Sequence, residues 1–216
     1  MTTTTNSGRA RSREGGGRRR ARGAAAPASE RRDHLVRLAA ELFAKKGFQA
    51  TTVREIADEA GILSGSLYHH FDSKESIVDE ILSNFYTELK AANRAAIEQG
   101  GPDEALGALV RIAFGTLEPH RAAITVLQND WNYLKGLDRF AYLIKAEEDV
   151  EEMWITAIRS GQDAGLFRAD LEPRLTYRMI RDTIWVTVRW FHTDGFDTEA
   201  LTAHYLNVLL DGIHIH

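Results

Sequence analysis

The chain has 216 residues, of which 44% are hydrophobic, and its formal net charge at pH 7 is -4. It contains no cysteine, which excludes disulfides, thiolate metal ligands and thiol redox switches. No apolar run approaches the roughly 18 residues that a membrane-spanning helix needs. We therefore expect a soluble, cytoplasmic protein with no membrane partner.

Positive charge is concentrated at the N-terminus. Residues 1–29 contain seven arginines and one glutamate, a net charge of +6, so the rest of the chain carries -10. This segment has almost no large apolar side chains to offset the entropy lost on ordering, and we expect a disordered basic arm. Such an arm suits a polyanionic partner, but many basic tails are only solvated, so its contact with nucleic acid stays open.

From Glu30 onward the apolar residues recur at helical spacing. Positions i, i+3, i+4, i+7 and i+8 from Leu35 are all apolar, which predicts a helix over 30–46 that Gly47 ends. A second helix follows Thr51 or Thr52, either of which can cap it, and ends at Gly61.

The next two helices are predicted from a short and a long pattern. A third helix over about 64–70 places Leu67 inward. A long fourth helix starts after Asp72 or Ser73, with Glu75 in capping-box position relative to Asp72.

The remainder of the chain also reads as helix. Breaks rich in Gly, Pro and Asp separate segments at about 103–118, 121–134, 139–164, 173–193 and 198–212. No segment alternates apolar and polar residues with hairpin turns between, and no internal repeat is present. The sequence predicts an all-α fold.

The second and third helices, joined by a short turn with Gly61 and supported by the first helix, have the spacing of a helix-turn-helix. The same spacing also fits any helical hairpin. The third helix, however, is unusually polar, and small hydroxyls, a phenol and imidazoles suit base edges and phosphates. The candidate DNA-contacting residues are Thr51, Thr52, Ser64, Gly65, Ser66, Tyr68, His69, His70 and Lys74.

The stretch FAKKGFQATTVREIADEAGILSGSLYHHFDSKESIV resembles the N-terminal domain of TetR-family transcriptional repressors. This resemblance implies a helix-turn-helix DNA-binding domain over 30–80 and a ligand-binding and dimerisation domain over 81–216, after the arm at 1–29. It also implies DNA contacts for Thr52, Ser64, Gly65, Tyr68, His69 and Lys74. The implied protein is a repressor without enzymatic activity or cofactor, whose partners are double-stranded operator DNA and a small-molecule effector.

A single recognition helix makes few contacts, so a two-fold dimer that reads a palindrome is expected. The apolar segments 173–193 and 198–212 suit a four-helix interface with a second copy, although packing within one chain would explain them too. The family resemblance favours the homodimer. The candidate interface residues are Leu201, Tyr205, Val208, Leu209 and Leu210.

The segment YRMIRDTIWVTVRWFH places Arg181, Trp185 and Arg189 at i, i+4 and i+8, a stripe of two cations around an indole. Because Arg178 and Asp182 can pair with each other, Arg181 is left to seek an anion. The stripe fits an Arg–Trp stack, an intersubunit ion pair, or a pocket for an anionic ligand with a flat apolar part.

The pair of segments ILSGSLYHHF and IRDTIWVTVRW resembles the TetR-family subgroup that represses steroid-ring catabolism in cholesterol-degrading actinobacteria. That resemblance implies release from DNA by a CoA thioester of a ring metabolite. Further pocket candidates are Phe85, Tyr86, Phe114, Leu117, Leu127 and Trp131.

Three other interpretations remain. Scattered histidines and the acidic run over 147–152 could suggest an enzyme, but no recognisable catalytic or metal-binding spacing is present. A nucleoid-associated binder using the basic arm would show a steep salt dependence and little sequence preference. A repressor of the same type could instead respond to a fatty acyl-CoA, a flavonoid or a drug.

Overall fold

A computed structural model describes residues 1–2, 28–190, 195 and 197–214. Within these residues the chain is helical without a named strand, as predicted. The predicted disorder of the basic arm concerns residues 3–27, which lie outside the described part, as do residues 191–193 of the predicted helix over 173–193.

The N-terminal unit consists of α1 (Ala28–Lys46), α2 (Val53–Glu59) and α3 (Ser64–Leu67). Gly47 and Gly61, with φ of 86° and 63°, make the turns that follow α1 and α2, in a backbone region that side chains disfavour. Thr52 caps α2 through a capping box with Glu55. The third helix is shorter than predicted, ending at Leu67 instead of residue 70.

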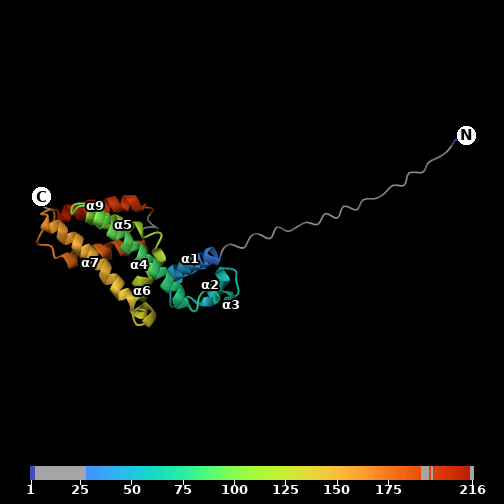
Figure 1. Ribbon diagram of the computed structural model, residues 1–216. Helices are drawn as coiled ribbons and strands as arrows, with labels where there is room; N and C mark the ends of the chain where they lie inside the picture. The colour runs from blue at the N-terminus through green and yellow to red at the C-terminus, as the bar shows by residue number, and fades with distance from the viewer. Residues whose placement is uncertain (3–27, 191–194, 196, 215–216) are drawn as a thin grey trace.

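α4 (Lys74–Gln99) runs from the N-terminal unit into the larger part of the molecule (Figure 1). Ser73 is its N-cap and forms a reciprocal capping box with Ser76, so the expected box between Asp72 and Glu75 is wrong. The Ser73 hydroxyl is the acceptor that the Ser76 amide reaches, at 3.2 Å, which leaves the Asp72 carboxylate available for another partner.

The larger part, called the body here, adds α5 (Ala105–Gly115), α6 (Arg121–Leu134), α7 (Tyr142–Asp163), α8 (Pro173–Val186) and α9 (Thr198–Ile213). Short 3-10 helices lie at η1 (Asp138–Phe140) and η2 (Thr187–Arg189). The helix predicted over 139–164 is therefore interrupted between η1 and α7, and the helix predicted from 173 changes to 3-10 geometry after Val186.

One hydrophobic core runs through both parts of the molecule. Ile77, Val78 and Leu82 of α4 are fully buried where the two parts meet, and α1 packs directly against α6. No helix in the described residues is both long and apolar enough to cross a membrane.

Candidate nucleic-acid interface and ligand cavity

α3 is attached to the N-terminal unit by one apolar side chain. Leu67 is 1% exposed and packs in the core, while Phe71, four residues beyond the end of the helix, is also buried. The remaining side chains of this short helix are thereby turned toward the surface. We call residues 28–73 the reading head, because Figure 1 places α2 and α3 at the end of the molecule away from α5, α7 and α9.

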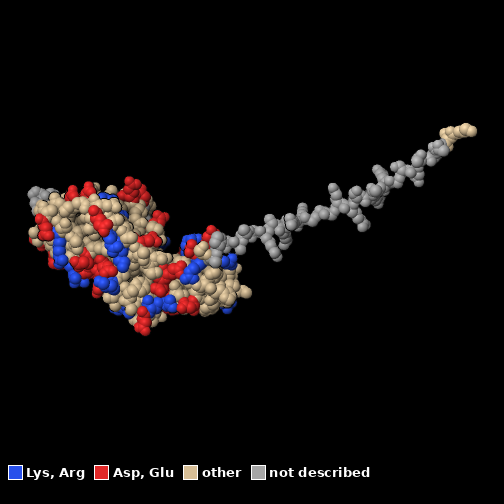
Figure 2. All heavy atoms as spheres, in the orientation of Figure 1, with Lys and Arg blue, Asp and Glu red and all other residues tan. Residues whose placement is uncertain are grey.

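Several predicted DNA-contacting residues lie on this surface. Gly65 and His69 are exposed, Tyr68 is 56% exposed, and Ser64 and Ser66 are half-buried. The His70 carbonyl accepts a hydrogen bond from Arg32, so His70 is partly engaged inside the head. On the side of the head that Figure 2 shows, Lys and Arg are interspersed with Asp and Glu, so that side is not uniformly basic.

Leu63, which was not among the candidates, is the most exposed large apolar residue of the head, at 80%. It occupies the N-cap of α3 without making a side-chain cap. An apolar side chain at the start of a recognition helix can contact a thymine methyl group. Its position just before a run of small polar residues was the sequence feature that could have identified it.

Thr51 and Lys74, two further predicted DNA contacts, both bond to backbone carbonyls near the end of α1. The Thr51 side chain is buried, and its hydroxyl donates to the Gly47 carbonyl at 2.8 Å. The Lys74 ammonium donates to the carbonyls of Phe48, Thr51 and Gln49 at 2.7, 2.8 and 3.3 Å, and burial lowers its pKa. Both side chains instead hold the loop between α1 and α2.

Thr52 is exposed, but its hydroxyl is used in the capping box. It accepts from the Glu55 amide at 3.2 Å and donates to the Glu55 carboxylate at 2.9 Å. Hydrogen bonds from Lys46 and from Thr52 lower the pKa of Glu55 to about 2. The capping box thus fixes the first turn of α2, the helix that precedes the turn and α3.

In the body, a cavity of about 320 Å³ opens between four helices. It brings together five of the predicted ligand residues, namely Tyr86, Leu127, Trp131, Arg181 and Trp185. Gln128, Glu147 and Asp182 complete its lining and were not among the candidates.

The other predicted ligand residues lie elsewhere. Phe85, Phe114 and Leu117 are fully buried core residues, with the Phe85 ring 6.4 Å from that of Trp185, just behind the cavity. Arg189 belongs to η2 and is exposed, so the predicted stripe is interrupted where α8 ends. Its Nε donates to the Gln128 side-chain oxygen at 3.2 Å, while the Gln128 amide donates to the Trp185 carbonyl at 2.8 Å.

Arg181 is already paired. Its guanidinium donates to Glu147 at 3.0 Å and to Asp182 at 2.8 Å, so the expected pairing of Arg178 with Asp182 is wrong. Burial opposes its charged form, yet the hydrogen bond to Asp182 and the nearby Tyr177 and Glu147 raise its pKa overall. The other Glu147 oxygen accepts from the Tyr86 hydroxyl at 3.1 Å. Glu147 therefore connects α4, α7 and α8 within the cavity wall.

The predicted dimer residues divide into two groups. Val208 is 64% exposed, whereas Leu201, Leu209 and Leu210 pack partly against the chain's own core. The Tyr205 ring lies 5.2 Å from that of Phe114 and its hydroxyl reaches the Ile180 carbonyl, so Tyr205 is mainly an internal contact. Large apolar residues that sequence analysis missed are exposed on α8: Leu175 at 58%, Met179 at 66% and Val186 at 45%.

Two family models match the chain. Residues 35–81 match the model described as "Bacterial regulatory proteins, tetR family", and residues 99–213 match a tetracyclin repressor-like C-terminal domain. The resemblance seen in the helix-turn-helix therefore extends into the body.

Relatives and solved structures agree with these matches. The repressor KstR2 of Rhodococcus jostii (strain RHA1) is 43% identical over 187 residues, covering 86% of this chain and 92% of the relative. The structure of the ketosteroid transcriptional regulator KstR2 of Mycobacterium tuberculosis superposes with a TM-score of 0.82 at 42% identity, covering 86% of this chain and 96% of that one. AibR, solved with isovaleryl coenzyme A and operator DNA, shares the fold at 18% identity, with a TM-score of 0.73, covering 83% of this chain and 98% of that one.

The KstR2 relatives are transcriptional repressors and not enzymes, and their similarity spans both the reading head and the body. The chain therefore belongs to the tetR family of bacterial regulatory proteins and is a transcriptional repressor homologous to KstR2.

Proposed function

We propose that the protein binds a palindromic operator in the cytoplasm as a homodimer and is released when a CoA thioester of a steroid-ring catabolite enters the body cavity. The observation that carries the ligand assignment is the presence of Arg181 and Trp185 in the lining of one cavity. A guanidinium binds an anionic group, and an indole packs against a flat apolar one.

The ion pairs around Arg181 supply a means of response. An anionic ligand that approaches Arg181 competes with Glu147, whose second oxygen is bonded to Tyr86 of α4. Separating a half-buried pair is costly unless the ligand replaces the lost contact. Ligands that lack a negative group should therefore enter poorly, which favours a thioester with phosphates over a cationic drug.

The cavity volume limits what can be enclosed. About 320 Å³ is at the lower end of the usual range for small-molecule pockets. In the described conformation it can enclose only part of a CoA thioester, so we assign the acyl body to the cavity. The phosphates would then reach Arg181, whose side chain is 26% exposed in the cavity wall, and the nucleotide end would extend outside to Arg189, which is exposed beside Gln128.

The apolar surface of α8 supports a dimer. Leu175, Met179 and Val186 lie at i, i+4 and i+11 on α8, and Val208 adds an exposed apolar residue from α9. Exposed apolar residues that gather on one pair of helices are typical of an interaction surface. We assign them to a two-fold interface, which would give the two recognition helices one relative orientation and spacing.

α4 can transmit ligand binding to the head. Tyr86 of this helix lines the cavity, and Lys74 at its start holds the loop between α1 and α2. A small rotation of α4 would therefore change the separation of the two reading heads and break register with the half-sites. The KstR2 relatives, one of which is described as a ketosteroid regulator, support the steroid assignment.

The test is binding to the DNA upstream of the protein's own coding sequence, with and without a panel of ring-derived and fatty acyl-CoA thioesters and the matching free acids. We expect release by a ring-derived thioester. Arg181→Gln and Trp185→Ala should retain operator binding and lose the response, with the effector concentration for half-release rising about tenfold or more.

Arg178→Gln is the matched control, because Arg178 is exposed on the same helix and does not line the cavity. Release by fatty acyl-CoA alone would replace the ligand assignment. Sequence-specific binding that no thioester changes would remove it, and binding without sequence preference would contradict the operator itself.

A further inference from the structure

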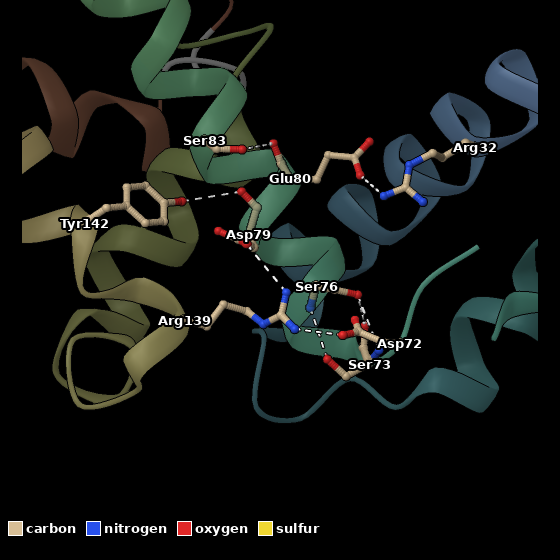
Figure 3. Close-up of polar contacts among 9 residues, drawn as sticks. All are labelled: Arg32, Asp72, Ser73, Ser76, Asp79, Glu80, Ser83, Arg139 and Tyr142. Atoms are coloured by element: carbon tan, nitrogen blue, oxygen red, sulfur yellow. Dashed lines mark hydrogen bonds and ion pairs between the residues drawn. The ribbon is translucent and has the colours of Figure 1, made fainter. Parts of the chain in front are cut away.

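A set of polar contacts connects the body to the reading head at the start of α4 (Figure 3). Arg139 of η1 donates to Asp72 at 2.8 Å and pairs with Asp79 at 3.6 Å. Asp72 immediately follows Phe71 at the end of the head, and Asp79 is the sixth residue of α4. One guanidinium from the body thus spans the junction between head and helix.

Neighbouring groups keep this junction in place. The Tyr142 hydroxyl, just after η1, reaches the Asp79 carbonyl at 3.4 Å. The Ser73–Ser76 capping box fixes the first turn of α4. On the opposite side of α4, Arg32 of α1 pairs with Glu80 (Figure 3). Arg32 also donates to the His70 carbonyl, which anchors the segment after α3 within the head.

The body holds the head at a second point as well. Asp130 of α6 is buried and accepts from the Gln49 side chain at 3.0 Å, and the Tyr133 ring lies 6.0 Å from that of Phe48. A single point of attachment would let the head pivot about α4, whereas two separate points define an orientation. The contacts of α6 with α1 and with the loop after α1 form one such point, and Arg139 of η1 supplies the other.

We propose that Arg139 is a positioning residue for operator binding, which holds the reading head at a defined angle to the body through Asp72 and Asp79. This inference rests on the proposed function, because its consequence is measured on an operator. A head held at one angle loses less orientational freedom when a dimer engages two half-sites, so binding is tighter. A head that can pivot must instead be ordered by the DNA, and this ordering reduces the free energy of binding.

Protein stability is a poor measure of this role. Arg139 and Asp72 are well exposed, at 38% and 67% of their side chains, and such ion pairs contribute little to folding. Arg139→Gln should therefore fold and melt like the wild type, while operator affinity falls about fivefold. Arg174→Gln is the matched control, since Arg174 pairs with Glu151 inside the body at 2.9 Å and spans no junction.

The same substitution made in a variant that lacks both carboxylates distinguishes a positioning role from direct contact with DNA. With both carboxylates neutralised, as Asp72→Asn and Asp79→Asn, Arg139 has no ion-pair partner at the junction of head and α4, so Arg139→Gln should change affinity less than about twofold. An undiminished loss in this background would mean that Arg139 contacts DNA itself. Wild-type affinity in the single Arg139→Gln variant would equally overturn the proposal.

The angle can be measured without DNA. The chain contains no cysteine, so spin labels at Glu59→Cys in the head and Thr156→Cys in the body report one distance per chain, diluted with unlabelled protein. Arg139→Gln should broaden this distribution and Arg174→Gln should not. If the wild type bound none of its upstream DNA, the proposed function would fail, whereas an unbroadened distribution would refute the positioning role.

Discussion

The reading head and the ligand cavity differ in how far apart along the chain their residues lie. The candidate DNA contacts on α3 and the turn after it fall within seven consecutive residues, 64–70, whereas the cavity combines residues between Tyr86 and Trp185. The head is therefore specified by one contiguous segment with a buried anchor, Leu67. The cavity depends on how four helices pack, so its chemistry is set by partners distant in sequence.

The strongest way to test this difference is to disturb packing in the body. Gly161 is buried on α7, and a Cβ there would lie 2.1 Å from the ring of the fully buried Phe167. We expect Gly161→Ala to lower the free energy of unfolding by about 2 kcal/mol, because an overpacked core must shift. Urea denaturation measures this.

Gly212→Ala is the control for that measurement. Gly212 lies on α9, and a Cβ there would meet nothing within 4 Å. This variant should be at least as stable as the wild type, since alanine favours helix over glycine. A Gly161→Ala protein as stable as Gly212→Ala would show that the body adapts more easily than its packing indicates.

The converse test alters the head without disturbing its packing. A Cβ on Gly65 would meet nothing within 4 Å, so Gly65→Ala should fold normally. The added methyl group lies on the exposed face of α3, where it would separate the backbone from the DNA. We expect operator affinity to fall about tenfold, a loss of about 1.4 kcal/mol in binding.

Gly115→Ala serves as the matched substitution, since Gly115 is equally unobstructed but lies on α5 of the body. Titration of labelled operator with both variants would measure the difference. Equal affinities would mean that the α3 backbone does not approach the duplex closely, and the contact would then have to come from Leu63 or Tyr68.

The sequence predicted the elements well and the pairing of charges poorly. α6 has the predicted bounds of 121–134, and five predicted cavity residues lie together. Arg181, by contrast, was expected to lack a partner. Helical spacing predicts only pairs within one helix, such as Arg178 with Asp182, and cannot reveal Glu147, which is 34 residues away from Arg181. Partners across helices depend on packing angles that periodicity does not encode.

The same limit applies to caps and hydroxyls. Thr51 and Thr52 are chemically alike, yet Thr51 is buried with its hydroxyl on the Gly47 carbonyl and Thr52 caps α2, because neighbouring side chains on an extended backbone point to opposite sides. The sequence indicated a capping box at Asp72 and Glu75, whereas the structure has boxes at Thr52 and Ser73. Spacing indicates which residues can cap, and the local backbone decides which of them do.

The smallest expected effect concerns the cap of α2. Hydrogen bonds from Lys46 and Thr52 lower the pKa of Glu55 from 4.5 to about 2. A carboxyl whose pKa is depressed on folding stabilises the protein above its unfolded pKa, and this contribution is lost as the pH falls from about 4.5 toward 2. Glutamine at this position can still complete a capping box but does not titrate.

Glu55→Gln should therefore show a shallower loss of stability than the wild type as the pH falls over this range, with the two proteins converging near pH 2. Denaturant midpoints measured at several pH values would reveal the difference in slope. Glu59→Gln, which removes a carboxylate from α2 without touching the cap, controls for net charge. Parallel curves for wild type and Glu55→Gln would mean that the cap does not depend on the charge of Glu55, and that even this local part of the head is held by packing against α1.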